Sequence, residues 1–184
     1  MSDKFILSLA RKAVDTYVAV NKRISVPEKY PEGLDEKRGV FVTIYKVGRF
    51  KELKGCVGLP YPEMPLIKGI IEASISACQD MRFSSLTKDD LKKIKLEISV
   101  LTEPELIEVK EPEDYLKKIE IGRDGLIIKK GVMSGLLLPQ VAVEYKWDVK
   151  EYLKNLCLKA GLLSDSWMDK SVKIYRFEAH IIKE

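Results

Sequence analysis

Apolar residues recur at spacings of three and four in three long segments of the chain, and this spacing predicts three helices with one buried face each. These helices cover residues 3–20, 65–79 and 148–161. Shorter helices are expected at 87–90 and over 111–118, each beginning at residues suited to a helix N-terminus. The helical pattern therefore occupies both halves of the chain.

Strands are predicted between these helices, in segments that alternate apolar and polar residues or are rich in β-branched ones: 39–47, 53–59, 95–101, 133–138 and 172–182. A further hairpin is predicted over 119–130, turning at Gly122-Arg123-Asp124-Gly125. Hairpins and strands interrupted irregularly by helices indicate an α+β fold, with a mainly antiparallel sheet and flanking helices. No repeat or flexible linker divides residues 1–184, so we expect a single domain.

Composition and charge narrow the class of protein. Hydrophobic residues make up 46% of the chain and charged residues 33%, which is typical of a folded globular protein. No apolar run approaches the ~20 residues that span a bilayer, and no uninterrupted signal sequence is present, so we expect a cytoplasmic protein without a membrane partner. The net charge of +4 is mild and interspersed, which disfavours nucleic-acid binding. Abundant lysine with few amide side chains is typical of thermophilic proteins.

The cysteines and the histidine exclude several common chemistries. Three widely spaced cysteines do not form a disulfide framework, and no C-x-x-C pair indicates a zinc or iron–sulfur site. A single histidine, His180, rules out a His-rich metal centre. The Gly122–Gly125 turn joins two predicted strands rather than opening a helix, so it is no phosphate loop. The sequence thus indicates no metal and no particular cofactor.

Cys56 is the candidate catalytic residue. One face of its strand carries Lys54, Cys56 and Gly58, and the other is apolar, with Leu53, Val57 and Leu59. Cys56 thus faces away from the core, beside a lysine that favours a thiolate. Two interpretations remain open: a reactive or ligand-contacting thiol in a pocket held open by Gly55 and Gly58, or a small buried hydrophobe against which another element packs tightly. Cys78 and Cys157 lie on apolar helical stripes and are expected to be buried.

Other polar residues are candidates for ligand binding. Asp80 and Arg82 follow the second long helix, where Arg82 either binds an anion or pairs with Asp80 or the helix C-terminus. Glu97 and Ser99 lie on the polar face of their strand and would share a surface with Cys56, Lys54 and Thr43 if the strands are neighbours; the alternative is a solvated sheet face. Two further candidates are Arg123, at the tip of its turn, and Gln140, beside an apolar strand.

Seven segments together resemble the AMMECR family: Leu53-Lys54-Gly55-Cys56-Val57-Gly58, Asp80-Met81-Arg82-Phe83, Leu96–Leu101, Ile121–Leu126, Gly135–Ala142, Trp147-Asp148 and Cys157–Leu162. They span nearly the whole chain in the order of the family. The resemblance implies an α+β fold with a larger lobe around an antiparallel sheet and a smaller β lobe. It also implies an association with Memo-like and radical-SAM partners, and any radical chemistry would belong to the partner.

The sequence departs from the family pattern at two positions. Lys54 stands where the family usually has arginine, which weakens the case for bidentate anion binding there, and Val57 stands where isoleucine is common. Three functions remain open. The first is an enzyme or enzyme subunit with a cleft around Cys56, the second is a non-catalytic adaptor that binds a protein or small ligand, and the third, least favoured, is a nucleic-acid-binding protein.

Overall fold

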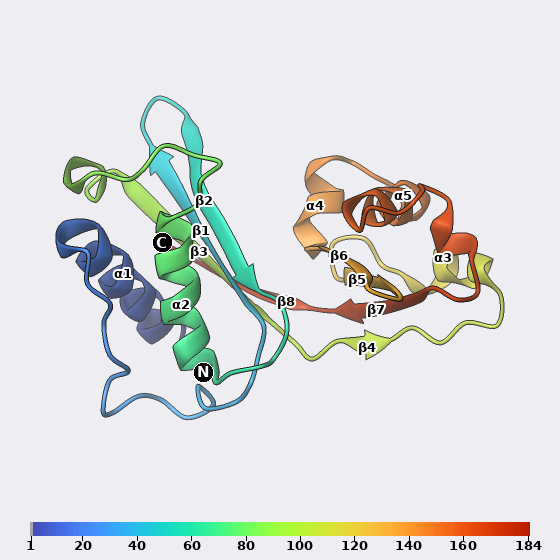
Figure 1. Cartoon of the computed structure of the whole chain (residues 1–184), viewed down its shortest axis with the longest axis horizontal. Helices are drawn as coiled ribbons and strands as arrows, with labels where there is room; N and C mark the ends of the chain where they lie inside the picture. The colour runs from blue at the N-terminus through green and yellow to red at the C-terminus, as the bar shows by residue number, and fades with distance from the viewer. Residues whose placement is uncertain (1) are drawn as a thin grey trace. The chain divides into compact units, whose positions relative to one another are not determined.

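A computed structural model describes residues 2–184, which form two compact units. The N-terminal unit contains the residues up to Leu101 together with His180–Glu184, and the C-terminal unit contains Thr102–Ala179. Each unit has its own four-stranded sheet and its own hydrophobic core (Figure 1). The predicted α+β class with mainly antiparallel sheets is therefore confirmed.

The N-terminal unit has a four-stranded sheet in the order β2-β1-β3-β8, so that β2 is an edge strand. Its elements in chain order are α1 (Asp3–Val20), β1 (Val40–Val47), β2 (Lys51–Leu59), α2 (Leu66–Cys78), the 3-10 turn η1 (Lys88–Asp90), β3 (Ile94–Leu101) and β8 (Ala179–Lys183). The helices predicted over 3–20 and 65–79 and the strands predicted over 39–47, 53–59 and 95–101 are confirmed. The Ser2 hydroxyl accepts the Phe5 N–H and begins α1, as helix-capping serines do.

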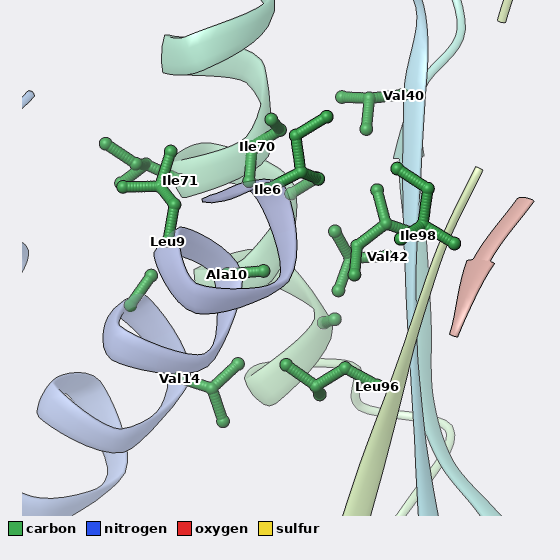
Figure 2. Packing of buried hydrophobic residues seen from close by; sticks show 14 of the residues in the cluster. Ile6, Leu9, Ala10, Val14, Val40, Val42, Ile70, Ile71, Leu96 and Ile98 are labelled. Carbon is green, nitrogen blue, oxygen red and sulfur yellow. The ribbon is translucent and has the colours of Figure 1, made fainter. Parts of the chain in front are cut away.

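The core of this unit lies between the sheet and the apolar stripes of α1 and α2 (Figure 2). Val40, Val42 and Ile44 of β1 alternate with outward-facing residues and are fully buried. Ile6 and Ile70 approach them from the two helices. Burial of these aliphatic side chains fixes which face of the sheet is internal, and thereby which side chains remain for the other face.

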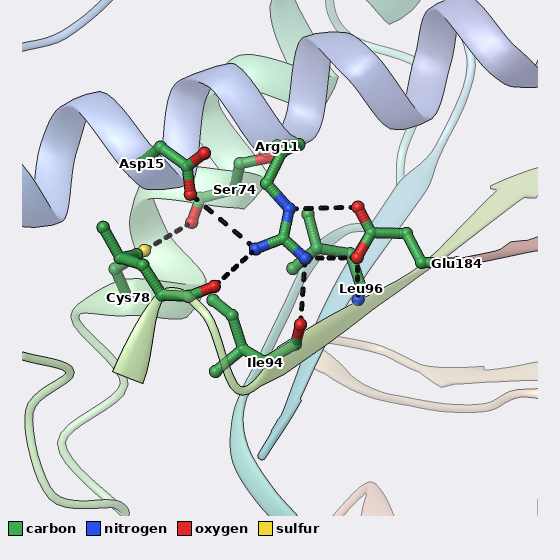
Figure 3. A network of polar contacts seen from close by, with 8 residues as sticks. Arg11, Asp15, Ser74, Cys78, Ile94, Leu96 and Glu184 are labelled. Atoms are coloured by element: carbon green, nitrogen blue, oxygen red, sulfur yellow. Dashed lines mark hydrogen bonds and ion pairs between the residues drawn. The ribbon is translucent and has the colours of Figure 1, made fainter. Parts of the chain in front are cut away.

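Arg11 of α1 joins the helix to the end of the chain (Figure 3). Its Nε donates to the Glu184 carboxylate at 3.0 Å, and its two terminal nitrogens donate to the carbonyls of Leu91 and Ile94. The same carboxylate accepts the Leu96 N–H at 3.1 Å. A charge-assisted network of this kind fastens the last strand to β3 and α1. Residues close to both termini therefore stabilise one unit.

The C-terminal unit has a sheet in the order β4-β7-β5-β6. Its elements are β4 (Glu105–Leu106), the 3-10 turn η2 (Pro112–Asp114), α3 (Tyr115–Lys118), β5 (Gly125–Lys130), β6 (Met133–Leu137), α4 (Pro139–Glu144), α5 (Val149–Lys159), the 3-10 turn η3 (Ser166–Met168) and β7 (Lys173–Phe177). The Asp148 carboxylate accepts the Glu151 N–H and begins α5. Tyr152 of α5 is fully buried, and its hydroxyl lies 3.0–3.2 Å from the carbonyls of Asp124, Leu137 and Leu138.

The predicted hairpin over 119–130 is wrong, because only its second half is a strand. The Asp124 carboxylate accepts the Glu120 N–H at 2.8 Å, and the Asp124 N–H donates to the Glu120 carbonyl at 3.0 Å. These bonds close residues 120–124 into a loop, with Gly122 at a φ of 89° that favours glycine. β5 instead pairs with β6 across the turn at residues 131–132.

The single strand predicted over 172–182 is also wrong. The chain forms β7 in one sheet and β8 in the other, interrupted at Glu178. The Glu178 N–H donates to the Thr102 hydroxyl, and its carbonyl accepts the Thr102 N–H, both at 2.9 Å. Helix α4 was not predicted. Pro139 stops β6 as expected, but it also occupies the first turn of α4, where its missing N–H costs no helical hydrogen bond.

Over residues 2–184, no helix combines the length and the apolar character that crossing a membrane requires.

Candidate functional site

Cys56 lies in a row of polar side chains that crosses the N-terminal sheet. It is directly opposite Thr43 of β1, and Thr43 is in turn opposite Glu97 of β3. Residues paired in this way point to the same face of a sheet, with Cβ atoms about 4.5–5.5 Å apart. We call this line of Cys56, Thr43 and Glu97 the polar row. It lies on the face opposite the helices, because the intervening residues Val42 and Val57 face the helices.

A β-bulge changes the register beside the polar row. Ile44 pairs with Gly55, but Tyr45 pairs with Leu53, so Lys54 is the extra residue of β2. Leu53 therefore lies opposite Tyr45, on the same sheet face as Thr43. The prediction that Leu53 faces the core with Val57 is wrong, because a bulge reverses the alternation on one side of it. Cys56 lies beyond the bulge and keeps the predicted orientation.

The Cys56 thiol differs from the two other thiols in its surroundings. The Thr43 hydroxyl donates to its Sγ at 3.4 Å, and the residue is only partly buried. Cys78 is also only partly buried, but it donates its thiol to the Ser74 carbonyl, and desolvation raises its pKa to about 12. Cys157 is fully buried, which also raises the pKa of its thiol. Cys56 is therefore the cysteine best placed to meet a solute.

Asp80 and Arg82 hold the backbone of Cys56 from the open side of the edge strand. The Cys56 N–H donates to Asp80 Oδ2 at 3.0 Å, and Arg82 Nη2 donates to the Cys56 carbonyl at 2.8 Å. The two side chains also bind each other, at 2.6 and 2.9 Å. We call this arrangement the Asp80–Arg82 clamp. It satisfies peptide groups that an edge strand otherwise leaves open, and it fixes the position of the thiol-bearing residue.

The clamp depends on an ionised Asp80. Its side chain is only 5% exposed, whereas that of Arg82 is 64% exposed. The hydrogen bond from Arg82 holds the pKa of the Asp80 carboxyl well below its ordinary value, the Cys56 N–H acts in the same direction, and burial opposes both. Of the two interpretations of Arg82, the pairing with Asp80 is the one observed.

The spaces beside Gly55 and Gly58 are filled by other parts of the protein. A Cβ at Gly55 would lie 2.0 Å from the Ala77 carbonyl oxygen, so glycine lets the end of α2 pass close to β2. A Cβ at Gly58 would lie 2.2 Å from the Phe41 ring. The approach of α2 at Gly55 also brings Asp80, just beyond that helix, to the Cys56 N–H. Both glycines thus have packing partners.

The remaining candidates of this unit have partners inside it. Lys54 Nζ lies 2.7 Å from the Glu52 carboxylate and donates to the Ser84 hydroxyl at 3.1 Å. Glu97 is 8% exposed and pairs with Lys183 of β8 at 3.0 Å, which extends the polar row across the sheet. Ser99 is 3% exposed, opposite Phe41. The side chains of Glu97 and Ser99 are thus mostly buried rather than fully solvated.

His180 does not join the polar row. Its Nε2 lies 3.0 Å from the carboxylate of Asp3 in α1, on the helix side of the sheet. A Cys56–His180 dyad is therefore not formed. Among residues 2–184, no three His, Cys, Asp or Glu side chains are grouped so that they could hold a metal ion.

Arg123 and Gln140 belong to the C-terminal unit. Arg123 donates two hydrogen bonds to the buried Asp124 carboxylate at 2.8 and 3.0 Å, and pairs with Glu120 at 2.6 Å. It also lines a cavity of about 340 Å³. Gln140 lies in the first turn of α4, and its buried Oε1 has no hydrogen-bond partner among the described residues.

Comparison with known proteins decides the family. The sequence profile of the AMMECR1 family matches residues 7–182. The chain belongs to the AMMECR1 family. Protein MJ0810 of Methanocaldococcus jannaschii is 54% identical over 181 residues, covering 98% of this chain and 89% of that protein. Protein PYRAB00100 of Pyrococcus abyssi is 48% identical, with 98% and 89% coverage.

A solved structure of the family has the same fold. The crystal structure of the uncharacterized protein PH0010 from Pyrococcus horikoshii superposes with a TM-score of 0.91 at 44% identity. The match covers 98% of this chain and 90% of that one. These AMMECR1 relatives come from thermophilic archaea, in agreement with the lysine-rich, amide-poor composition. The relatives are named only by locus. Membership of the AMMECR1 family therefore establishes the fold, and an activity has to be inferred from the geometry of the site.

Sequence reasoning missed several residues that contact the predicted candidates in this AMMECR1 chain. Phe41 covers Gly58, Ser84 binds Lys54, and Lys183 pairs with Glu97. The alternation in β1 could have identified Phe41, because residues 41 and 43 are two positions apart and therefore lie on the same face of the strand. Ser84 and Lys183 had no such signal, because their contacts span 30 and 86 positions of the chain.

Proposed function

We propose that the polar face of the N-terminal sheet is a small-molecule site, in which Cys56 acts as ligand contact or nucleophile. The observation that carries the proposal is the way Cys56 is held. Its N–H and carbonyl are fixed by the Asp80–Arg82 clamp, and its sulfur accepts the Thr43 hydroxyl. The clamp would hold the backbone of any residue at this position, whereas the contact from the Thr43 hydroxyl to the sulfur is specific to the cysteine side chain.

The chemistry of the polar row supports this function. The Thr43 hydroxyl contacts the sulfur of Cys56 and fixes its direction on this face of the sheet. A thiolate sulfur attacks electrophiles and binds soft ligands. Glu97 and its partner Lys183 place a carboxylate and an ammonium further along the same row. Thiol, hydroxyl, carboxylate and ammonium groups on one surface are suited to a polar substrate with an electrophilic centre.

The alternative is a non-catalytic binding module that uses the same surface. The family resemblance adds Memo-like and radical-SAM proteins as partners of either form. The two forms differ in their need for sulfur, because Cys56→Ser keeps the size and hydrogen bonding of the side chain but removes the nucleophile. A module keeps its affinity in this variant, whereas a thiol-dependent enzyme loses its reaction.

The first test measures the reactivity of each thiol in the folded protein. Three variants that each retain one cysteine are alkylated with iodoacetamide at about pH 8, and the rates are followed by intact-mass spectrometry. We expect Cys56 to react at least about tenfold faster than Cys78 or Cys157, because desolvation raises the pKa of both other thiols and Cys157 is fully buried. Thr43→Val keeps the shape of its side chain but removes the hydroxyl, and should slow Cys56 alkylation.

Two results would count against the proposal. If Cys56 reacts no faster than Cys78 and Cys157, it is not an accessible thiol and the site has no sulfur chemistry. If Thr43→Val leaves the rate unchanged, the hydrogen bond to Sγ has no influence on reactivity. Thr102→Val is a matched control, because it removes a hydroxyl in the other unit and should leave the Cys56 rate unchanged.

A further inference from the structure

The C-terminal unit contains a cavity of about 780 Å³ that no candidate residue from the sequence lines. Three segments enclose it: residues 106–110 after β4, residues 114–118 in η2 and α3, and residues 170–173 before and at the start of β7. Its volume falls within the ~300–1,000 Å³ range of small-molecule pockets. All its lining residues belong to one unit, so the cavity is independent of the polar row.

The floor of the cavity is apolar. Ile107, Tyr115 and Val172 line it, and each is only 4–5% exposed because it packs into the core of the unit. Side chains held in a core keep their positions whether or not a ligand is present. The floor therefore offers a preformed surface for a flat or aliphatic ligand body.

The rim of the cavity is basic. Five of the twelve lining residues are lysines, against two carboxylates, Glu108 and Asp114. In the whole chain lysine and arginine together account for only 32 of 184 residues. Lysine is thus concentrated around this cavity beyond what the composition of the protein explains.

Two of these lysines have neither an ion pair nor a side-chain hydrogen bond among the described residues. Lys118 donates to the Glu108 carbonyl, and Lys170 pairs with Glu111 at 2.7 Å. Lys117 lies 3.8 Å from Asp114. By contrast, Lys110 and Lys173 form no ion pair with any residue in the part of the chain that the structure describes. Both line the cavity, so their ammonium groups are available to a ligand.

We infer that this cavity binds an organic anion, in which an apolar body lies on the Ile107–Tyr115–Val172 floor and a phosphate or carboxylate group contacts Lys110 and Lys173. An inorganic ion alone would leave the floor unused, and a neutral ligand would leave the two lysines unpaired. The cavity therefore matches a ligand that carries both an apolar body and an anionic group. Attraction to the basic rim makes binding sensitive to salt.

The test uses four probes that separate charge from apolar surface: 1-naphthyl phosphate, 1-naphthoate, 1-naphthol and inorganic phosphate. Affinities are measured by isothermal titration calorimetry with the full chain, and the site is located by amide chemical-shift changes. We expect one or both naphthyl anions to bind at least about tenfold more tightly than naphthol and phosphate. The shifts should concentrate in residues 106–118 and 170–173, and the tighter of the two anions identifies the charged group.

Charge-removing variants make the test specific. Lys110→Gln with Lys173→Gln should weaken naphthyl-anion binding about tenfold, as expected for the loss of hydrogen bonds to a charged group. Lys22→Gln with Lys29→Gln removes the same charge from exposed positions of the N-terminal unit and should leave affinity nearly unchanged. Equal effects of the two double variants would overturn the inference, and so would the absence of saturable binding by either naphthyl anion.

Discussion

The polar row of the N-terminal unit differs from the cavity lined by Lys110 and Lys173 in the C-terminal unit, which we call the lysine cavity, in whether its charged side chains are paired. Around Cys56 each candidate charge is paired within its own unit: Asp80 with Arg82, Lys54 with Glu52, and Glu97 with Lys183. Around the cavity, Lys110 and Lys173 have no such partner among the described residues. Paired charges position a reactive group, whereas unpaired charges beside an apolar floor are available to a ligand. The two regions therefore differ in what substitution should do to stability and to binding.

The largest effect on stability is expected at Gly55, where the backbone of α2 meets β2. Gly55→Ala places a methyl group 2.0 Å from the Ala77 carbonyl oxygen, and a backbone atom cannot rotate away as a side chain can. We expect a loss of about 1–3 kcal/mol or more in the free energy of unfolding, measured by urea denaturation. Cys56 alkylation should also change, because the end of α2 leads directly to the clamp.

Gly48→Ala is the matched control, since nothing lies within 4 Å of a Cβ there. Its effect should stay within about 0.5 kcal/mol. Similar stabilities for the two variants would show that α2 moves away from β2 at little cost. In that case, the close approach of α2 to β2 would not be what places the Asp80 carboxylate at the Cys56 N–H.

The second effect concerns Asp80 and depends on pH. Asp80→Asn removes the charge that Arg82 pairs with, and should cost about 1–3 kcal/mol at neutral pH. Because the native pKa of Asp80 lies below its ordinary value of ~3.9, its ionised form stabilises the protein above that value. This stabilisation is lost as the pH falls through the native pKa. The stability difference between wild type and variant should therefore shrink on acidification.

The exposed Asp89 provides a control for this measurement, because it forms no ion pair among residues 2–184. Asp89→Asn should change stability little at any pH. A difference between wild type and Asp80→Asn that stays constant from neutral to acid pH would contradict an ionised clamp. In that case Asp80 would act through its shape alone.

Much of this fold was predictable because its pattern is local. The stripe of α1 and the alternation of β3 depend on neighbouring residues, and the orientation of Cys56 follows from the same alternation. The bulge at Lys54 was not predictable, because one extra residue in β2 is visible only against the register of β1. The division of the last strand at Glu178 had the same origin, since its partner Thr102 is distant in sequence.

The candidate site was predictable in its members but not in their contacts. Asp80, Arg82 and Cys56 were all selected from sequence, yet nothing in the chain indicates that a side chain after α2 binds a peptide group in β2. The lysine cavity escaped prediction altogether. Lys110 and Lys173 lie in separate segments that read only as ordinary polar positions in a lysine-rich chain.

The smallest expected effects compare a paired lysine with the unpaired ones. Lys54→Gln breaks contacts with Glu52 and Ser84 and should cost about 0.5–1 kcal/mol in urea denaturation. Lys110→Gln with Lys173→Gln should stay within about 0.5 kcal/mol of wild type, because it breaks no ion pair among the described residues. If the double variant instead loses more stability than Lys54→Gln, then Lys110 and Lys173 stabilise the fold. Their charges would then not be free to bind an anion.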